Sequence, residues 1–575
     1  MIPCPATPSL MSSMPFSIFA RILAATLCAT SLVASGQTMP DAGVLQQQIE
    51  RERLQPLPRP IVAPKPAVPA DLQPSGTHVT VREFRFAGNT LLTREQLLPV
   101  VAGYLNRPLD FAQLQEVAAV VANAYRDAGW IVRTYLPQQD IHDGIVTIQI
   151  VEEVFGKSSL EGEATRISQT DIVARISRQQ PAGMPLNADA LDRAMLLIDD
   201  LPGITVAGTL RAGDREGETD LLLKVADEPF VIGEVSADNA GSRSTGADRL
   251  NANLVLASPL RFGDQLTANL IHTRGSDYLR MAYSLPVGED GWRIGANASR
   301  LDYRLVSADF ASLNAHGDSV STGVDASYPI IRSRLQNLFL NLAFDHRQFD
   351  NISSGSTTSR YELDSASVTL SGNLFDSLGG GGANSASATW VHGRVNLDGS
   401  PNRNADATTA RTHGIYDKVR YTASRQQVMT PDVSLYLMYS GQAAGKNLDS
   451  SEKFYLGGAN GVRAYPANEG GGSKGQMLNL ELRWKLPHGL TATAFQDWGR
   501  ISQNVDNNYA GAPNPNTYSL RGHGLAIGWQ ADFGLNLKAT WAHRQGSNPN
   551  PTTTGKDQDG SLDKNRWWLT ASLLF

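Results

Sequence analysis

The sequence predicts a mainly β protein, in which a C-terminal 16-stranded transmembrane β-barrel follows two α/β units and an N-terminal helix. Three observations predict this fold class. Segments of about ten residues alternate apolar and polar side chains over residues 229–575. The connections between these segments alternate between short and long. Residues 77–228 repeat one β-α-α-β-β order twice, and a chain of 575 residues has room for several such units.

Composition and charge narrow the class of protein. Hydrophobic residues make up 41% of the chain, charged residues make up 18%, and the mean hydropathy is −0.24. Beyond the N-terminus, no apolar run reaches the ~18 residues of a transmembrane helix. A transmembrane barrel remains compatible with this hydropathy, because its lipid-facing and lumen-facing residues alternate. The net charge of −6 argues against nucleic acid as a partner.

The N-terminus, residues 1–36, has the pattern of a secretory signal peptide. Arg21 precedes a short apolar stretch that is followed by small residues. Met11 and Met14 are alternative start sites. Both cysteines of the chain lie in this segment, so the mature protein is expected to form no disulfide. Cys28 is an alternative lipidation site, although the residues before it fit a lipobox poorly.

A polar helix is expected over residues 41–55, within an N-terminal segment of residues 37–55. Asp41 can serve as its N-cap, and the helix would be ~22 Å long. Its few apolar residues suit a water-filled channel or a solvated terminus better than a dry core, and both placements are open. Residues 56–76 contain seven prolines, which predict an extended, semi-rigid linker.

The two α/β units are expected over residues 77–153 and 154–228. Helical spacing at Leu114, Val117 and Val121 marks the longest helix of the first unit. The first unit is expected to contain strands at 79–86, 130–136 and 144–151, and helices at 93–102 and 111–128. The second is expected to contain strands at 155–160, 205–211 and 219–225, and helices at 169–178 and 188–199.

Residues 229–575 are expected to form the barrel. Leu480 and Trp484 share one face of a predicted strand, and Asn479 and Glu481 share the other. An apolar face opposite a polar face places lipid or core on one side and water on the other. The sixteen strands are expected to begin near residues 229, 247, 263, 277, 291, 317, 335, 361, 383, 412, 432, 475, 490, 521, 534 and 566.

Loop lengths distinguish a closed barrel from a soluble β-sandwich, because the strands of a sandwich would also alternate apolar and polar side chains. Connections after even-numbered strands are short, whereas those after odd-numbered strands are often long. The long ones are residues 304–316, 397–411, 444–474, 501–520 and 546–565. An outer-membrane barrel has short periplasmic turns and long external loops, so the α/β units are expected in the periplasm. The final strand ends in Phe575, which resembles the C-terminal signal of bacterial outer-membrane proteins.

No catalytic constellation stands out in the sequence. The ten histidines show no metal-ligand spacing, and Ser451 and Ser473 lack the context of a nucleophile elbow. The four glycines at 379–382 lack the following Lys and Ser/Thr of a phosphate loop, and they fall in a predicted periplasmic turn. We therefore expect no enzymatic activity, no metal and no cofactor.

Several motifs resemble those of two-partner secretion transporters, the haemolysin activator and filamentous haemagglutinin transporter type of the POTRA-plus-barrel superfamily. Residues 86–91, 124–129, 136–141 and 143–146 resemble the first POTRA domain, and residues 154–228 resemble the second. The long loop after the predicted eleventh strand resembles the loop-six motif of the superfamily, usually Val-Arg-Gly followed by Tyr or Phe. The corresponding residues are Val462, Arg463, Ala464 and Tyr465.

Phe495, Asp497 and Gly499 resemble the Phe-x-Asp-x-Gly partner motif of the barrel wall. The resemblance implies that Arg463 folds inward and pairs with Asp497. The alternation of apolar and polar residues along this strand supports the pairing independently, because it places Asp497 on the lumen face. A carboxylate that is screened from bulk water there needs a cationic partner. The alternative is an exposed arginine and a hydrated aspartate. Ala464 stands where the family usually has glycine, and it would be strained if that position needs a positive φ.

By this resemblance, the chain is expected to be an outer-membrane transporter that exports a large partner exoprotein without ATP. The exoprotein would be of the adhesin, haemolysin or haem-binding type. The POTRA domains are expected to capture it by β-augmentation, and the helix at 41–55 is expected to plug the pore. The other expected partners are outer-membrane lipid, periplasmic chaperones and the barrel-assembly machinery, with no nucleic acid.

The main alternative is an outer-membrane barrel-assembly insertase of the same superfamily. Insertases usually carry more POTRA domains, so two domains and a plug helix favour secretion. A diffusion porin would need neither the α/β units nor a pair between Arg463 and Asp497. An outer-membrane enzyme is disfavoured by the lack of a catalytic cluster.

Overall fold

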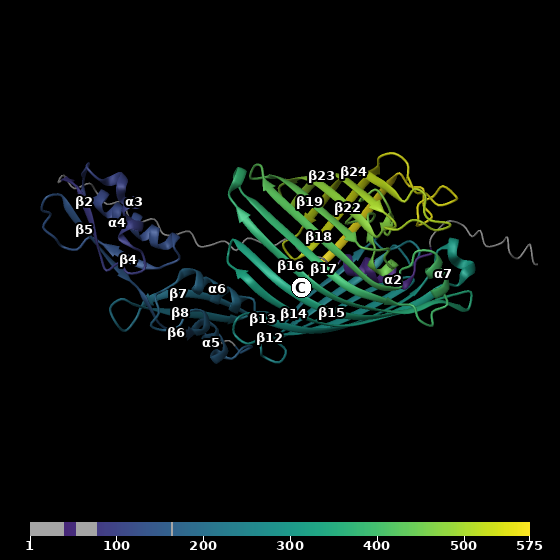
Figure 1. The fold of residues 1–575 in the computed structure, drawn as a ribbon, viewed down its shortest axis with the longest axis horizontal. Helices are drawn as coiled ribbons and strands as arrows, with labels where there is room; N and C mark the ends of the chain where they lie inside the picture. Colours follow the sequence, from purple (N-terminus) through teal and green to yellow (C-terminus); the bar gives the residue numbers. More distant parts are fainter. Residues whose placement is uncertain (1–38, 53–77, 163–164) are drawn as a thin grey trace, which may run out of the picture.

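The computed structural model describes residues 39–52, 78–162 and 165–575. The predicted signal peptide and the predicted proline-rich linker lie outside these ranges. Two α/β units lie at one end of a closed β-barrel, and the long loops lie at the opposite end (Figure 1). Within the described ranges, no helix is long and apolar enough to cross a membrane.

Sixteen antiparallel strands close the barrel, as the sequence predicts. Each strand pairs with the next one along the chain, and the last, β26, pairs with the first, β9. The strands are β9 (Val231–Asp238), β10 (Arg249–Ala257), β11 (Gln265–Thr273), β12 (Ser276–Val287), β13 (Trp292–Arg304), β14 (His316–Arg332), β15 (Gln336–Ser353), β16 (Ser356–Asp376), β17 (Gly382–Asn396), β18 (Gly414–Val428), β19 (Val433–Ala444), β22 (Lys474–Lys485), β23 (Leu490–Ser502), β24 (Thr517–Gln530), β25 (Leu535–Arg544) and β26 (Asn565–Leu574).

Alternation along the strands places apolar side chains outside and polar side chains inside. On β22, Leu480 and Trp484 are 39% and 55% exposed, whereas Asn479 is only 4% exposed. Apolar area left in water costs about 25 cal/mol per Å² relative to burial, so this outer face is suited to lipid.

Strand β16 begins at Ser356, five residues before its predicted start at residue 361. Ser354 and Gly355 have positive φ values of 51° and 77°, which suit a two-residue hairpin turn. The ladder between β15 and β16 therefore continues past the expected strand ends. The sequence there is rich in serine and threonine on both faces, so hydrophobic alternation does not mark it.

The first α/β unit has a three-stranded sheet in the order β2-β5-β4. Its elements are β1 (Val79–Thr80), β2 (Glu83–Ala87), α3 (Arg94–Val101), η1 (Ala102–Tyr104), β3 (Pro108–Leu109), α4 (Phe111–Asp127), β4 (Val132–Tyr135) and β5 (Ile145–Glu152). The prediction of one strand at 79–86 is wrong, because the chain bends between β1 and β2. Val81 is fully buried at the bend, the Arg82 amide donates to the Gly144 carbonyl at 2.7 Å, and β1 pairs with β3 instead.

The second α/β unit follows the same order. Its elements are β6 (Val154–Glu161), α5 (Gln169–Gln179), α6 (Ala188–Asp199), β7 (Ile204–Ala212) and β8 (Glu218–Asp227). Strand β8 lies between β6, to which it is parallel, and β7, to which it is antiparallel. Strand β7 is thus an edge strand, and β8 leads directly into the barrel.

Ion pairs join the second α/β unit to the short turns of the barrel. Arg334 contacts both carboxylate oxygens of Asp192 on α6 at 3.0–3.1 Å, and Arg332 contacts both oxygens of Asp200 at 2.7 and 2.8 Å. A third guanidinium, of Arg178 on α5, contacts Asp290 at 3.0 Å and holds the pKa of that carboxyl below its usual value. Two turns of the barrel rim, between β12 and β13 and between β14 and β15, therefore fix the orientation of this unit.

We predict that Arg332→Gln combined with Arg334→Gln loosens the second α/β unit without unfolding the barrel. Each partly exposed pair contributes only about 0–1 kcal/mol, so the unit would remain attached but rotate more freely. Distances between spin labels on α6 and on the rim of β14 should broaden in a double electron–electron resonance experiment. Lys224→Gln, a charge removal on the same unit away from the barrel, is the control. Unchanged distributions would contradict this account of the interface.

Candidate functional site

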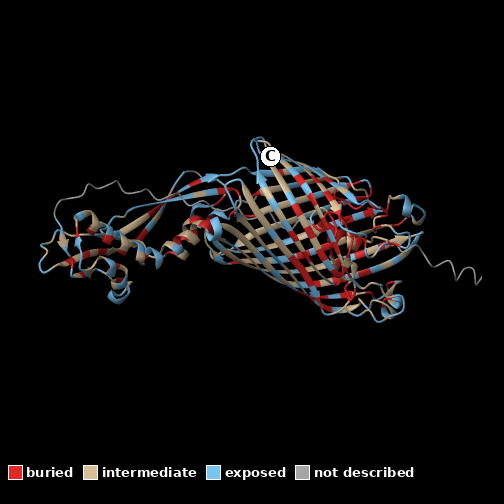
Figure 2. Cartoon of the chain, turned by 90° about the horizontal axis from the view of Figure 1, so that it is seen from above, coloured by how far each residue is buried: buried red, intermediate tan, exposed pale blue. Residues whose placement is uncertain are grey.

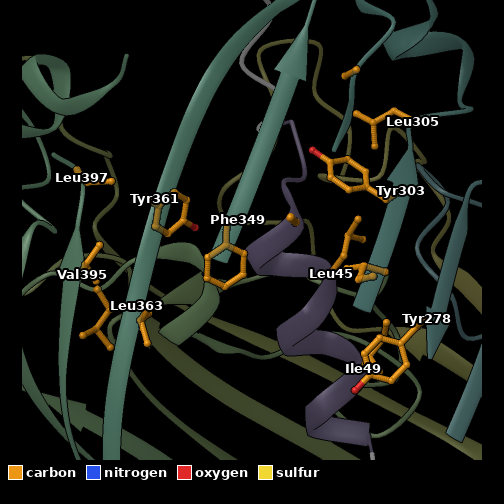
Figure 3. Packing of buried hydrophobic residues seen from close by; sticks show 14 of the residues in the cluster. Leu45, Ile49, Tyr278, Tyr303, Leu305, Phe349, Tyr361, Leu363, Val395 and Leu397 are labelled. Carbon is orange, nitrogen blue, oxygen red and sulfur yellow. The ribbon is translucent and has the colours of Figure 1, made fainter. Parts of the chain in front are cut away.

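Helix α2 (Ala42–Glu52) lies inside the barrel. Its apolar residues Leu45 and Ile49 pack against Tyr278 and Tyr303 of the barrel wall (Figure 3). Its glutamines 46, 47 and 48 are also buried, at 2–8% exposure. Buried residues concentrate in the half of the barrel away from the α/β units (Figure 2). The helix predicted over 41–55 is therefore present, with its last three residues outside the described ranges, and it occupies the channel rather than a solvated terminus.

The external connection between β19 and β22, residues 445–473, also folds into the barrel, and we call it loop six. It contains η4 (Ser450–Glu452), β20 (Phe454–Tyr455) and β21 (Gly471–Gly472). Leu456, Val462 and Tyr465 are at most 1% exposed. They form a core with wall residues of β22 to β25, namely Met477, Phe495, Ile501, Tyr518, Leu520 and Ala542.

A glycine-rich turn aims the tip of loop six at the wall. The Val462 amide donates to the Leu456 carbonyl at 2.7 Å, and the Tyr465 amide donates to the Val462 carbonyl at 3.0 Å. A Cβ at Gly461 would lie only 2.0 Å from the Leu456 carbonyl oxygen, so this turn requires glycine there. The compact turn places Arg463 opposite β23.

Arg463 and Asp497 form a buried bidentate ion pair. The Arg463 Nε and Nη2 atoms donate to the two Asp497 oxygens at 2.9 and 2.7 Å, and the Arg463 backbone amide donates to the same carboxylate at 3.0 Å. The side chains of Arg463 and Asp497 are 6% and 0% exposed. Buried charges require such complete pairing, because an unpaired charge in this environment would be strongly unfavourable.

Two further wall residues complete the surroundings of Arg463. Its Nη1 atom donates to Glu481 at 2.7 Å, and its guanidinium lies 3.5 Å from the ring centroid of Phe495. The Asn479 amide donates to Asp497 at 2.8 Å. The strand alternation predicts that Glu481 and Asn479 face the lumen, but no pattern in the sequence places them beside Arg463.

The remaining motif residues explain how the loop tip fits the wall. Ala464 is fully buried and does not have a positive φ, so alanine at this position is not strained. Its Cβ occupies the space above Gly522, where an added Cβ would lie 2.4 Å from it. A Cβ at Gly499 would likewise lie 2.6 Å from the side chain of Leu456. The ring of Tyr465 lies 4.3 Å from the Arg544 guanidinium.

The last strand also contacts loop six and closes the barrel. The indole of Trp568 donates to the Arg463 carbonyl at 2.8 Å. The Phe575 amide donates to the Gly233 carbonyl, and the Gly233 amide donates to the Phe575 carbonyl, both at 2.9 Å. Phe575 itself is 62% exposed. Trp568 was not identified from the sequence, where the aromatic pair at 567–568 could have been read as one lipid-facing and one lumen-facing residue.

Helix α2 is bonded to loop six at both of its ends. Asp41, which accepts from the Val44 amide at 2.9 Å as an N-cap, also accepts from the Ser450 hydroxyl at 2.8 Å. At the other end, Arg51 donates to the carbonyls of Tyr455 and Gly457. Helix and loop therefore form one assembly inside the barrel.

This arrangement defines an outer-membrane barrel of the POTRA-plus-barrel class, with a helix and an inward-folded loop inside it. In the described part of the chain, no cluster of three or more His, Cys, Asp or Glu could hold a metal ion. The family model described as haemolysin secretion/activation protein ShlB/FhaC/HecB matches residues 217–530, and the POTRA domain of ShlB type matches residues 79–153. The chain belongs to this family of two-partner secretion transporters.

Curated relatives match nearly the full chain. The heme/hemopexin transporter protein HuxB of Haemophilus influenzae (strain 86-028NP) is 24% identical over 557 residues, covering 94% of this chain and 95% of HuxB. The outer membrane transporter CdiB of Dickeya dadantii (strain 3937) is 27% identical over 520 residues, covering 87% of each protein. Both relatives are transporters rather than enzymes.

Solved structures share the fold. CdiB from Escherichia coli has a TM-score of 0.68 at 22% identity, covering 94% of this chain and all of that one. BamA from Haemophilus ducreyi lacking POTRA domains 1–3 has a TM-score of 0.51 at 15% identity, covering 86% of this chain and all of that one. The fold is thus more similar to that of CdiB than to that of BamA.

The protein is therefore an outer-membrane transporter that exports partner exoproteins, with its POTRA domains in the periplasm. The family, the barrel and the POTRA domains predicted from the sequence are confirmed.

We predict that Arg463→Ala releases loop six while leaving the barrel folded. The substitution leaves Asp497 buried without its cation, and breaking a buried pair costs about 3–5 kcal/mol. Hydrogen exchange at residues 456–472 should therefore accelerate about 100-fold or more. Arg500→Ala is the control and should change nothing, because Arg500 is an exposed arginine on β23, the strand that carries Asp497. Equal protection of loop six in Arg463→Ala and the unmodified protein would contradict this prediction.

Proposed function

We propose that α2 and loop six together close the pore at rest, and that both must move before an exoprotein can pass. The observation that carries this proposal is the position of α2 inside the barrel, with hydrogen bonds to loop six at both ends. In this proposal, Arg463 and Asp497 fix loop six to the wall. Residues 37–55 act as a plug and residues 56–76 as the tether that lets it leave.

The cargo is a large exoprotein of the adhesin, haemolysin or haem-binding type. It reaches the periplasm unfolded and binds the POTRA domains by adding a strand to a sheet edge. Strand β7 supports this mode, because within the described residues it pairs only with β8 and most of its residues are exposed. The backbone groups on its outer edge can bond an extended chain.

Export in this proposal needs no ATP and no catalytic residue, and folding outside the cell gives the direction. Periplasmic chaperones deliver the newly made transporter, and the barrel-assembly machinery inserts it. Phe575, at the end of the last strand, is the signal that this machinery recognises. Lipid contacts the outer apolar face of the strands.

The test compares culture-supernatant and outer-membrane proteomes of cells with the protein, without it, and with Arg463→Ala. We predict the loss of one large secreted protein in the deletion strain, with the other barrels unchanged, and a reduced amount in Arg463→Ala. Selective loss would also name the cargo. Arg500→Ala again serves as the control.

Broad depletion of outer-membrane barrels, with no selective loss from the supernatant, would favour the insertase instead. Unchanged secretion in Arg463→Ala, at an unchanged level of the protein, would contradict the proposed role of this pair.

A further inference from the structure

A second buried ionic cluster anchors loop six, eleven residues before Arg463. The Glu452 carboxylate accepts from Arg347 Nη1 at 2.8 Å and forms an ion pair with Lys418. The side chains of Glu452 and Lys418 are 4% and 1% exposed, and that of Arg347 is 14% exposed. None of these residues belongs to the motifs recognised in the sequence.

The Glu452 backbone is bound to the wall as well. Its carbonyl accepts from Lys418 Nζ at 3.0 Å and from Gln442 Nε2 at 3.0 Å. Arg347 lies on β15, Lys418 on β18 and Gln442 on β19. Three strands therefore bind one residue of η4, and this contact lies on a different part of the wall from that of Arg463 on β22 and β23.

The residues on either side of Glu452 bind α2. The Ser450 hydroxyl donates to Asp41 at 2.8 Å, and Gln47 Nε2 donates to the Lys453 carbonyl at 2.7 Å. Gly43 approaches the same turn so closely that an added Cβ would lie 2.9 Å from the Ser450 hydroxyl oxygen. The turn thus contacts the wall through Glu452 and contacts the helix through its neighbours.

We propose that Glu452 is a positioning residue, which holds η4 against Lys418 and Arg347 so that the turn forms the seat of α2. The inference rests on the proposed role of α2 as a plug. Loop six then has two anchors of opposite polarity. Arg463 places a loop cation on wall carboxylates, and Glu452 places a loop carboxylate on wall cations.

The two anchors differ in what they control. The Arg463 pair fixes the tip of loop six, whereas Glu452 fixes the turn that binds the start of α2. Loss of Glu452 should therefore free the helix while the tip stays bound to Asp497. Removing the carboxylate leaves Lys418 and Arg347 buried, with Asp345 4.0 Å from Arg347 as a weaker partner, so the native position of η4 becomes unfavourable.

The experiment measures single-channel conductance of the purified full-length protein in planar lipid bilayers. A variant that lacks residues 41–52 provides the reference for an unplugged pore. We expect Glu452→Gln to raise the fraction of time spent in that high-conductance state about tenfold. The control is Asp302→Asn, which also replaces a carboxylate with an amide. Asp302 forms an exposed ion pair with Arg300 on β13, away from η4, so this substitution should leave the closed fraction unchanged.

Charge coupling separates positioning from simple packing. In Glu452→Gln combined with Lys418→Met, carboxylate and cation are removed together, so the closed fraction should return toward that of the unmodified protein. Should Glu452→Gln fail to assemble, as judged by heat-modifiable mobility in gels, Glu452→Asp replaces it in the same cycle, with partial opening expected.

The outcomes separate the role of α2 as a plug from the role of Glu452 as a positioning residue. If the variant without residues 41–52 conducts no more than the intact protein, the plug role itself is wrong. If that variant opens but Glu452→Gln or Glu452→Asp stays closed, the inference about Glu452 is overturned. Opening that Lys418→Met does not reverse would also overturn it, because the effect would then come from packing.

Discussion

The buried pair between Arg463 and Asp497 is the interaction on which the barrel interior depends. It holds a loop of twenty-nine residues, 445–473, inside a pore that would otherwise be a wide channel. Neither charge is tolerable there alone, so each charge fixes the position of the other while loop six lies inside the barrel. Helix α2 depends on this in turn, because both of its ends are bonded to loop six.

Much of the fold could be predicted because membrane burial imposes a strict pattern on a barrel. Every strand must alternate between lipid and lumen, and the short turns must lie on one side, so sixteen strands were found in the right order. The same alternation predicted that Asp497 faces the lumen. It was less informative where a strand is rich in serine and threonine on both faces, and the start of β16 was missed for this reason.

Contacts between distant segments could not be predicted in the same way. Glu452 carries no local signal, because its partners Lys418 and Arg347 are brought to it only by the curvature of the barrel and the path of loop six. The fit of Ala464 is similar. Alanine fits at this position because Gly522, on β24 of the wall, leaves room for its Cβ. The sequence around Ala464 suggests backbone strain, but the structure has no positive φ there.

The most direct test of the account locks α2 in place. A Cβ at Gly43 would lie 3.0 Å from the Ser451 Cβ, below the ~3.5–4.5 Å of a disulfide, so the turn must move away from the helix by about 0.5 Å or more for the bond to form. The two cysteines of the chain, Cys4 and Cys28, lie outside the described residues. In Gly43→Cys combined with Ser451→Cys, export should stop when the disulfide forms and resume when it is reduced. Full export with the disulfide fully formed would contradict the claim that α2 must leave its seat.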